Sequence, residues 1–221
     1  MNAQATKGYI GVGMDGIIAR WYAGITRNNM PDYKKDAAKI AQWIASGDAA
    51  LDLAPGPGYL AIELAKLGNF KVSGLDISAT FVEIAAANAA KAGVKVAFRQ
   101  GDASAMPYKD ETFNLIVCRA AFKNFSRPVA ALDEMRRVLK PGGKAVIIDL
   151  RADASPEVVK QEVEKMGLNP FNEWMTKMAF NTMLLKRAYT RQSITEVVAE
   201  SAFKTCKIDE DGLGLEVTLT K

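Results

Sequence analysis

The sequence predicts an α/β fold built around a mostly parallel sheet, and three observations predict it. Short apolar runs alternate with helical patterns throughout residues 49–150, which is typical of strand–helix–strand units that place parallel strands side by side. In the first such unit, the glycine-rich segment Pro55–Gly58 joins the strand to the helix. Two alternating segments near the end of the chain flank the acidic stretch Asp209–Gly212, which indicates a hairpin.

Residues 49–67 hold the strand, turn and helix around which the other elements are arranged. The run 49–54 is apolar apart from Asp52, as expected for a strand buried on both faces. Glycines in the turn let backbone N–H groups approach a ligand beside the positive N-terminus of the following helix. The stretch therefore predicts a nucleotide-type site. The spacing Gly56-x-Gly58-x-x-Ala61 also fits a dinucleotide (NAD) turn, so both cofactor classes stay open on this stretch alone.

Composition predicts a single soluble domain. The chain has 221 residues, of which 49% are hydrophobic and 24% charged, and this is an ordinary globular balance. The net charge is +4, but the basic residues are scattered, which argues against a nucleic-acid face and supports only a mild attraction for anions. No apolar run approaches the ~20 residues of a membrane span, and residues 1–7 do not lead into a signal peptide. We expect a cytoplasmic protein.

The residue types that are missing restrict the chemistry. There is no histidine, which excludes a Ser-His-Asp or Cys-His nucleophile system, a His-ligated metal and the usual general base. Cys118 and Cys206 lie far apart without metal-type spacing, so we expect buried small side chains and no metal site.

The remaining elements follow in order. Ahead of the first strand, an apolar segment covers 17–25 and a helix is expected over 32–45. A second strand ends at Asp76, 18 residues after Gly58, where a carboxylate can accept both hydroxyls of an adenosine ribose. Ser78 is a good N-cap for a helix over 79–92. Further strands are expected over 94–100, 113–118, 145–150, 204–209 and 213–221, and further helices over 128–139, 155–166, 172–187 and 190–201.

Two later motifs separate the two cofactor classes. Gly101-Asp102-Ala103 follows the third strand, and Lys140-Pro-Gly-Gly precedes the fifth. Together with the glycine turn and Asp76 they form an ordered set over residues 45–150. This set resembles the class I S-adenosylmethionine (SAM) methyltransferases, particularly the small-molecule type similar to the ubiquinone and menaquinone C-methyltransferases. An NAD enzyme would explain only the first two motifs.

The chain departs from the family's pattern at three places. Ala54 stands where the commoner form has Gly, and Asn114 stands where it has Asp. The loop after the fourth strand has Lys123 and Asn124 where many relatives have histidines.

The resemblance implies a Rossmann-like seven-stranded sheet with helices on both faces and the last strand antiparallel. The chain would be one domain: an N-terminal helical cap over 1–48, a SAM-binding core over 49–150, a helical lid or substrate region over 151–203 and a strand hairpin over 204–221. SAM would be the cofactor and S-adenosylhomocysteine (SAH) its product. Asp102 would receive the adenine amino group, with Ala103 against the ring. The implied cofactor-binding residues are Asp52, Ala54, Gly56, Gly58, Asp76, Ile77, Asp102, Ala103 and Arg119.

Catalysis of methyl transfer from a sulfonium can rest mainly on proximity and orientation, which can lower the activation free energy by ~7–11 kcal/mol. A site without histidine suits that chemistry. The expected catalytic residues are Lys123, Arg119, Asp149 and Tyr22, with Tyr9 and Tyr189 as further candidate bases. Arg119, Lys123 and Arg151 could hold an anionic acceptor or could be surface cations.

The functional hypothesis is a SAM-dependent methyltransferase acting on a small anionic or apolar acceptor, without nucleic acid and with the oligomeric state open. The alternative is a SAM-binding protein of the same fold that does not transfer methyl, such as a cyclase-like catalyst or a regulator. An RNA- or protein-directed enzyme is disfavoured because the fourth strand ends in Val117–Ala120, without an Asn-Pro-Pro-Tyr type clamp.

Overall fold

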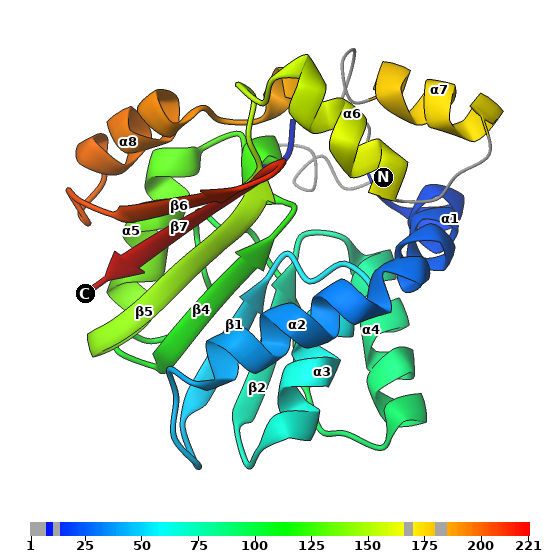
Figure 1. Ribbon diagram of the computed structural model, residues 1–221. Helices are drawn as coiled ribbons and strands as arrows, with labels where there is room; N and C mark the ends of the chain where they lie inside the picture. Colours follow the sequence, from blue (N-terminus) through cyan, green and yellow to red (C-terminus); the bar gives the residue numbers. More distant parts are fainter. Residues whose placement is uncertain (1–7, 11–13, 166–169, 180–184) are drawn as a thin grey trace.

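A single sheet of seven strands organises the molecule (Figure 1). The computed structural model describes residues 8–10, 14–165, 170–179 and 185–221. The strand order is β3-β2-β1-β4-β5-β7-β6. The strands are β1 (Ala49–Leu53), β2 (Lys71–Asp76), β3 (Ala97–Gln100), β4 (Phe113–Arg119), β5 (Leu139–Leu150), β6 (Lys207–Asp211) and β7 (Gly214–Thr220). Neighbours among β1 to β5 pair in parallel, and β7 runs antiparallel to both β5 and β6. The predicted Rossmann-like sheet with one antiparallel strand is confirmed.

Helices cover both faces of the sheet. On one face, α2 (Met30–Ala41) and α3 (Tyr59–Leu67) pack on alternate residues of β1, β2 and β4, with α4 (Ala79–Ala92) beside α3. On the other, α5 (Pro128–Val138) and α8 (Arg191–Glu200) pack against the remaining alternate residues. Residues 151–203 were expected to form a lid or substrate region. Within that range, α8 instead packs against the sheet.

Three helices lie beyond the carboxyl ends of the strands (Figure 1). They are α1 (Gly16–Thr26), α6 (Pro156–Lys165) and α7 (Pro170–Ala179). Single 3₁₀ turns form η1 (Arg27–Asn29), η2 (Phe122–Asn124) and η4 (Leu185–Arg187).

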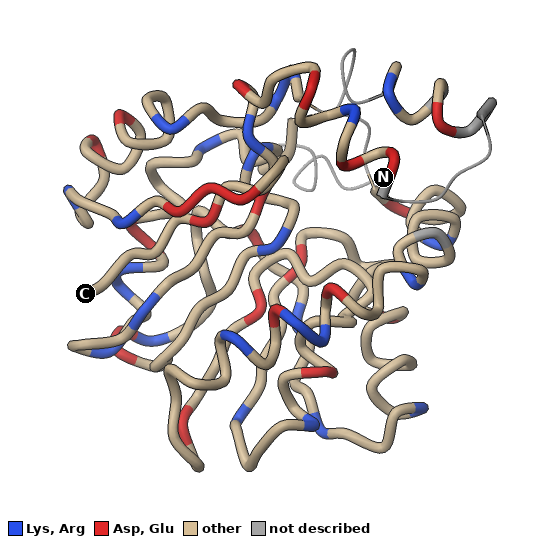
Figure 2. The backbone as a smooth tube through the Cα atoms, viewed as in Figure 1, with Lys and Arg blue, Asp and Glu red and all other residues tan. Residues whose placement is uncertain are grey.

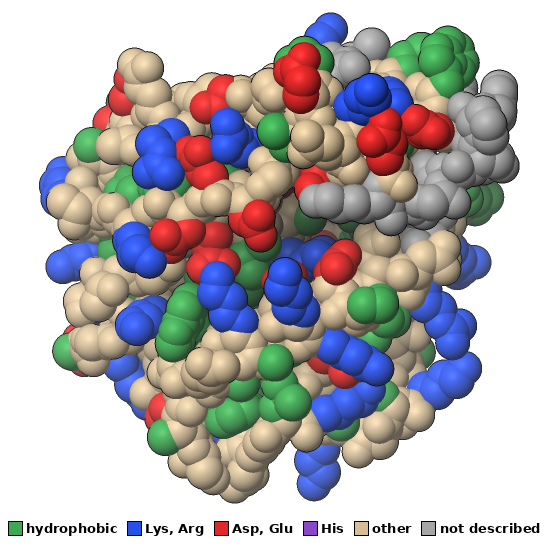
Figure 3. Space-filling view, viewed as in Figure 1, with side chains coloured by type: hydrophobic (Ala, Val, Ile, Leu, Met, Phe, Trp, Pro, Cys, Tyr) green, Lys and Arg blue, Asp and Glu red, His purple; other side chains and the backbone are tan. Residues whose placement is uncertain are grey.

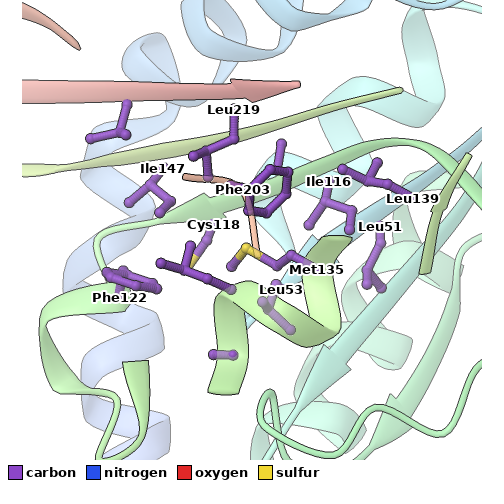
Figure 4. Packing of buried hydrophobic residues seen from close by; sticks show 14 of the residues in the cluster. Leu51, Leu53, Ile116, Cys118, Phe122, Met135, Leu139, Ile147, Phe203 and Leu219 are labelled. Carbon is purple, nitrogen blue, oxygen red and sulfur yellow. The ribbon is translucent and has the colours of Figure 1, made fainter. Parts of the chain in front are cut away.

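The larger core lies between the sheet and the α5–α8 face. Cys118 is fully buried there and points toward Leu53, Met135 and Phe122 (Figure 4). Burial raises the pKa of this thiol well above its ordinary value, so it stays protonated and behaves as a small apolar side chain.

Most boundaries fall close to where they were expected, with some exceptions. The fifth strand begins at Leu139 rather than residue 145, so the Lys140–Gly143 segment expected ahead of it lies within it, and the helix expected over 32–45 is α2, which ends at Ala41. The third strand begins at Ala97 rather than residue 94. Of the helix expected over 172–187, the described residues form α7 at Pro170–Ala179 and the 3₁₀ turn η4 at 185–187. Residues 180–184 of that expected helix, which include Phe180, Met183 and Leu184, lie outside the described residues.

The terminal hairpin also differs from the expectation. Glu210 and Asp211 were expected in the turn, but they lie in β6, and the turn is formed by residues 212–213. β6 is an edge strand with alternately exposed side chains, so acids are tolerated along it. Glu210 is paired with Arg151 and Arg191 at 2.7 and 2.8 Å.

Candidate cofactor and acceptor site

The turn between β1 and α3 presents bare backbone at the carboxyl end of the sheet. Ala54, Gly56 and Gly58 have φ of 57°, 53° and 81°. A Cβ at Gly58 would lie 2.8 Å from both Ala85 Cβ and Phe98 Cζ, so this position requires glycine. A Cβ at Gly56 would meet no atom of the described residues within 4 Å. Ala54 adopts a conformation that glycine favours and that costs another residue about 1–2 kcal/mol, and such strain gathers at functional sites.

Asp52 lies beneath this turn. Its Oδ2 accepts a hydrogen bond from the N–H of Ala61, in the first turn of α3, at 3.0 Å. A carboxylate at this place complements the helix dipole. The side chain is 2% exposed, and burial raises the pKa of Asp52 to about 7 although the Ala61 N–H lowers it. The surface that the turn offers to a ligand therefore consists of backbone, and the buried Asp52 carboxyl group holds the first turn of α3 behind it.

Asp76 ends β2 and ties the glycine turn to the start of α4. Its Oδ2 accepts from the Gly56 N–H and its Oδ1 from the Ser78 N–H, both at 2.9 Å. Burial raises the pKa of Asp76 to about 6, against the opposing effect of these two N–H donors. Ser78 caps α4 as predicted, accepting from the Phe81 N–H at 3.1 Å.

Asp102 lies beside Asp76 because β2 and β3 are parallel neighbours. Its Oδ1 accepts from the Ser104 N–H and Oγ at 2.8 and 2.6 Å, and its Oδ2 accepts from Arg127 at 2.8 Å. Partial burial alone would raise the pKa of Asp102, but the donors from Ser104 and Arg127 outweigh it and lower the pKa. The group is therefore an ionised acceptor at neutral pH.

A short N-terminal strap, residues 8–10, lies against the Asp102 carboxylate. Tyr9 forms an antiparallel bridge with Phe125, and the Ile10 N–H donates to the carbonyl of Asn124 at 2.8 Å. At Gly8, a Cβ would lie 2.7 Å from Ile77 Cδ1 and 3.0 Å from Asp102 Oδ2. The strap thus borders the site where the sequence placed the adenine ring.

Arg119 ends β4 and is held by α2. Its Nε donates to Asp36 Oδ2 at 2.7 Å, and its Cζ lies 4.3 Å from the centre of the Tyr33 ring. Both members of the ion pair are 18% exposed at their side chains. This cation therefore already has a carboxylate partner.

Lys123 and Asp149 form a second ion pair at the ends of β4 and β5. The Lys123 Nζ donates to Asp149 Oδ1 at 2.5 Å and to the carbonyl of Ala120 at 3.0 Å. The two side chains are 10% and 5% exposed. Arg151 is likewise paired, with Asp153 and Glu210 at 3.0 and 2.7 Å. The three cations expected to clamp an anionic acceptor all carry acidic partners, and charges of both signs gather at this end of the sheet (Figure 2).

Tyrosines from separate elements surround these ion pairs. Tyr22 of α1 packs edge-on against Phe81 with ring centres 6.0 Å apart, and Tyr189 packs on Phe122 at 5.7 Å. Burial raises the pKa of Tyr9, Tyr22 and Tyr189. At neutral pH these phenols are hydrogen-bond donors and aromatic walls rather than bases. Figure 3 shows a hollow in this face of the molecule, near the carboxyl ends of β4 and β5.

Three residues of the site were missed from the sequence. Asp36 is one of several charged residues on its helix, and Arg127 precedes a proline at a helix start without a distinguishing pattern. Gly8 lies in a segment that has no motif. Each contributes through a contact between distant parts of the chain, with separations of 83 residues for Asp36–Arg119 and 25 for Asp102–Arg127.

The comparisons with known proteins agree with this geometry. A family profile described as Methyltransferase domain matches residues 44–201. The demethylmenaquinone methyltransferase of Chlorobaculum parvum is 31% identical over 172 residues, which covers 76% of this chain and 68% of that protein. The ubiquinone/menaquinone biosynthesis C-methyltransferase UbiE of Bdellovibrio bacteriovorus is 37% identical over 105 residues, covering 47% of this chain and 45% of the relative. This second match therefore spans less than half of the relative's length.

A solved structure extends the likeness over nearly the whole chain. A Methanococcus maripaludis protein assigned to the S-adenosyl-L-methionine-dependent methyltransferases superposes with a TM-score of 0.75 at 25% identity, covering 96% of this chain and 95% of that one. Within the described residues, the longest apolar helices are too short to span a lipid bilayer.

Proposed function

Because this chain belongs to the family of S-adenosylmethionine-dependent methyltransferases, we propose that it transfers the methyl group of SAM to a small-molecule acceptor. One observation carries the proposal. Asp76 and Asp102 end or follow neighbouring parallel strands, and Asp76 is hydrogen-bonded to the glycine turn at 2.9 Å. Carboxylates at this edge of an open α/β sheet, beside a turn of bare backbone, suit an adenosine ligand.

The donor and acceptor sets fit the cofactor. An ionised carboxylate offers about four lone-pair sites, so Asp76 has capacity for ribose hydroxyls besides the two N–H groups it already accepts. Asp102 accepts three donors, which leaves one site for an adenine amino group. Ile77 and Ala103 would flank the ring. Arg119 uses only its Nε toward Asp36, so its remaining N–H groups suit the cofactor's carboxylate.

For the acceptor, we propose a planar aromatic hydroxyl compound of the quinol class. Two observations support this. The matched relatives are named for demethylmenaquinone and for ubiquinone and menaquinone biosynthesis. The surroundings of Lys123 are aromatic, with Tyr22 and Tyr189 on separate elements, and the cations there are already neutralised by Asp36 and Asp149. An aromatic ring gains more from such walls than a small anion does.

Lys123 is the residue we propose to hold the acceptor's oxygen. An ammonium has three donors, and two of them are used, by Asp149 and by the Ala120 carbonyl. The third suits the oxyanion of an ionised acceptor, whose charge it would stabilise from a side chain that is itself only 10% exposed. Asp149 keeps the ammonium in place. When bound, SAM supplies a sulfonium methyl that a nucleophile displaces in line. The protein's share is then to orient both molecules.

Thermal unfolding with SAM, SAH and NAD, each alone, tests the cofactor. A ligand at ~100 times its Kd stabilises by ~2.7 kcal/mol, which shifts the Tm of a chain of this size by roughly 5–10 °C. We expect the shift with SAM and SAH and its loss in Asp76→Asn. Asp209→Asn, which removes an exposed carboxylate from β6, is the matched control and should keep it. A shift with NAD alone would refute the assignment.

SAH release tests the reaction. We expect SAH to accumulate with hydroquinones or phenols as acceptors. SAH formed only with thiols would contradict the quinol class while preserving methyl transfer. Cofactor binding without SAH from phenols, thiols, amines or halides would favour the alternative role in which the fold binds SAM without transferring methyl.

A further inference from the structure

Helix α1 has two sides with different surroundings. On its inner side Ala19, Ala23 and Thr26 are buried, and Tyr22 faces the site. On its outer side Ile17 is 84% exposed and Trp21 is 65% exposed. Together with Ile18, this helix carries three of the seven large apolar side chains that the described residues expose most. Soluble surfaces seldom gather such residues without a binding partner.

The exposed residues form one stripe with a basic flank. Ile17 and Trp21 are four residues apart, so they lie one above the other on the helix. Arg20 lies beside them, and Arg27 follows directly after α1, in η1; both are exposed. Between Gly16 and Met30 the sequence contains no acidic residue. An apolar stripe that includes tryptophan and is bordered by arginine matches the boundary between the headgroups and acyl chains of an anionic bilayer.

The acidic residue nearest to this stripe in the sequence is held by another helix. Asp15, just before the helix, accepts a hydrogen bond from Ser78 Oγ at 2.5 Å, at the start of α4. The charges that this segment itself places beside the stripe, Arg20 and Arg27, are both positive. A second copy of this chain would meet Arg20 and Arg27 with the same two cations, whereas lipid phosphates complement them.

We propose that the outer side of α1 docks on the surface of an anionic lipid bilayer. Ile17 and Trp21 insert at the headgroup level, and Arg20 and Arg27 contact lipid phosphates. α1 lies at the end of the molecule where the strands end (Figure 1), and its inner residue Tyr22 lines the site. Docking through the outer side would hold the site close to the membrane. Delivery of a lipophilic acceptor rests on the proposed function, but the lipid contact does not.

Vesicle sedimentation with the full chain tests the proposal. Vesicles of phosphatidylcholine and phosphatidylglycerol in equal parts are compared with phosphatidylcholine alone. We expect binding to the mixed vesicles, weaker binding to the neutral ones, and weakening by salt. Trp21→Ser and Ile17→Ser should each lower the partition coefficient about tenfold, since each removes a large buried apolar contact. Arg20→Gln should weaken binding to the mixed vesicles only.

Leu67→Ser is the matched control. Leu67 is 51% exposed but ends α3, away from α1 (Figure 1), and its variant should sediment like the wild type. Binding of SAH by each variant confirms that it is folded and separates this test from that of methyl transfer. The proposal is overturned if the wild type ignores mixed vesicles or if Trp21→Ser binds them equally. A dimer that Trp21→Ser abolishes, seen without lipid, would assign the stripe to a second copy instead.

Discussion

Replacing Asp76 by asparagine separates the effect of its charge on cofactor binding from the effect on folding. The buried charge lowers the stability of the folded protein, whereas we expect it to strengthen cofactor binding. Burial raises the pKa of Asp76 from 3.8 to about 6, so holding the charge at pH 8 costs the folded state about 3 kcal/mol. Asparagine removes this cost. It also places an NH₂ group against one of the two N–H donors from Gly56 and Ser78, which costs about 1–3 kcal/mol. The two effects nearly cancel, so we expect the ligand-free stability at pH 8 to change by less than about 2 kcal/mol.

In Asp76→Asn, cofactor binding is weakened, and no second effect offsets the loss. Hydrogen bonds to a charged acceptor are worth about 1.5–3 kcal/mol, so the Kd for SAH should rise roughly 10- to 100-fold. Isothermal titration calorimetry measures it, with Asp209→Asn as control.

The pH dependence of unfolding gives an independent check. A carboxyl group whose pKa is higher in the folded than in the unfolded state stabilises the fold at low pH, where both states are protonated. That stability is lost as the pH rises from 3.8 to about 6, by up to about 3 kcal/mol. Urea unfolding of the wild type minus that of Asp76→Asn isolates this loss, because Asp52 titrates in both. The reasoning is refuted if the variant binds SAH like the wild type, or if the difference does not change over this pH range.

Three further outcomes are expected. Gly56→Ala should cost about 1 kcal/mol of unfolding free energy, from backbone strain alone, and Gly58→Ala about 2–4 kcal/mol because its Cβ also overlaps neighbours; equal costs in urea unfolding would contradict the geometry of the turn. Lys123→Met should cost about 3–5 kcal/mol of unfolding free energy, because it leaves the Asp149 charge buried without its cation. Adding Asp149→Asn should recover most of this loss. Additive losses in the double variant would show that the two side chains are not coupled. The affinity for SAH should fall as the pH drops below about 6, by up to about tenfold per pH unit, as Asp76 takes up a proton; a flat calorimetric profile would show that no ribose hydroxyl depends on the charge.

Local sequence patterns predicted the elements that local chemistry determines. The strand–turn–helix unit ends where glycine and apolar spacing placed its ends, because Gly58 is required by its φ of 81° and by its close neighbours. Ser78 capped its helix because the hydroxyl reaches an N–H three residues on. Asp76 and Asp102 end or follow neighbouring parallel strands, which bring their carboxyl ends to one edge of the sheet.

Contacts between distant segments were not predictable in the same way. Nothing near Asp36 in the sequence marks it as the partner of Arg119, because the pairing depends on how α2 crosses the sheet. The strap at Gly8 is held by backbone bonds, which carry no sequence signature. The misplaced hairpin turn has a similar origin: whether Glu210 and Asp211 form a turn or a strand depends on an edge position that periodicity alone does not reveal.

The position of β7 has a consequence for the order of folding. This strand lies between β5 and β6 and buries Leu215, Val217 and Leu219 in the larger core. Its end is joined to the Lys140–Gly143 segment, since the Gly142 N–H donates to the Lys221 carbonyl and the Lys221 N–H to the Gly143 carbonyl, at 2.9 and 3.1 Å. During synthesis on the ribosome, β1 to β5 can pair in succession, but β5 keeps an open apolar edge until residues 214–220 emerge. The seventh strand in chain order is thus an interior one, and the nascent chain stays exposed to edge-to-edge aggregation at β5 until β7 has been made.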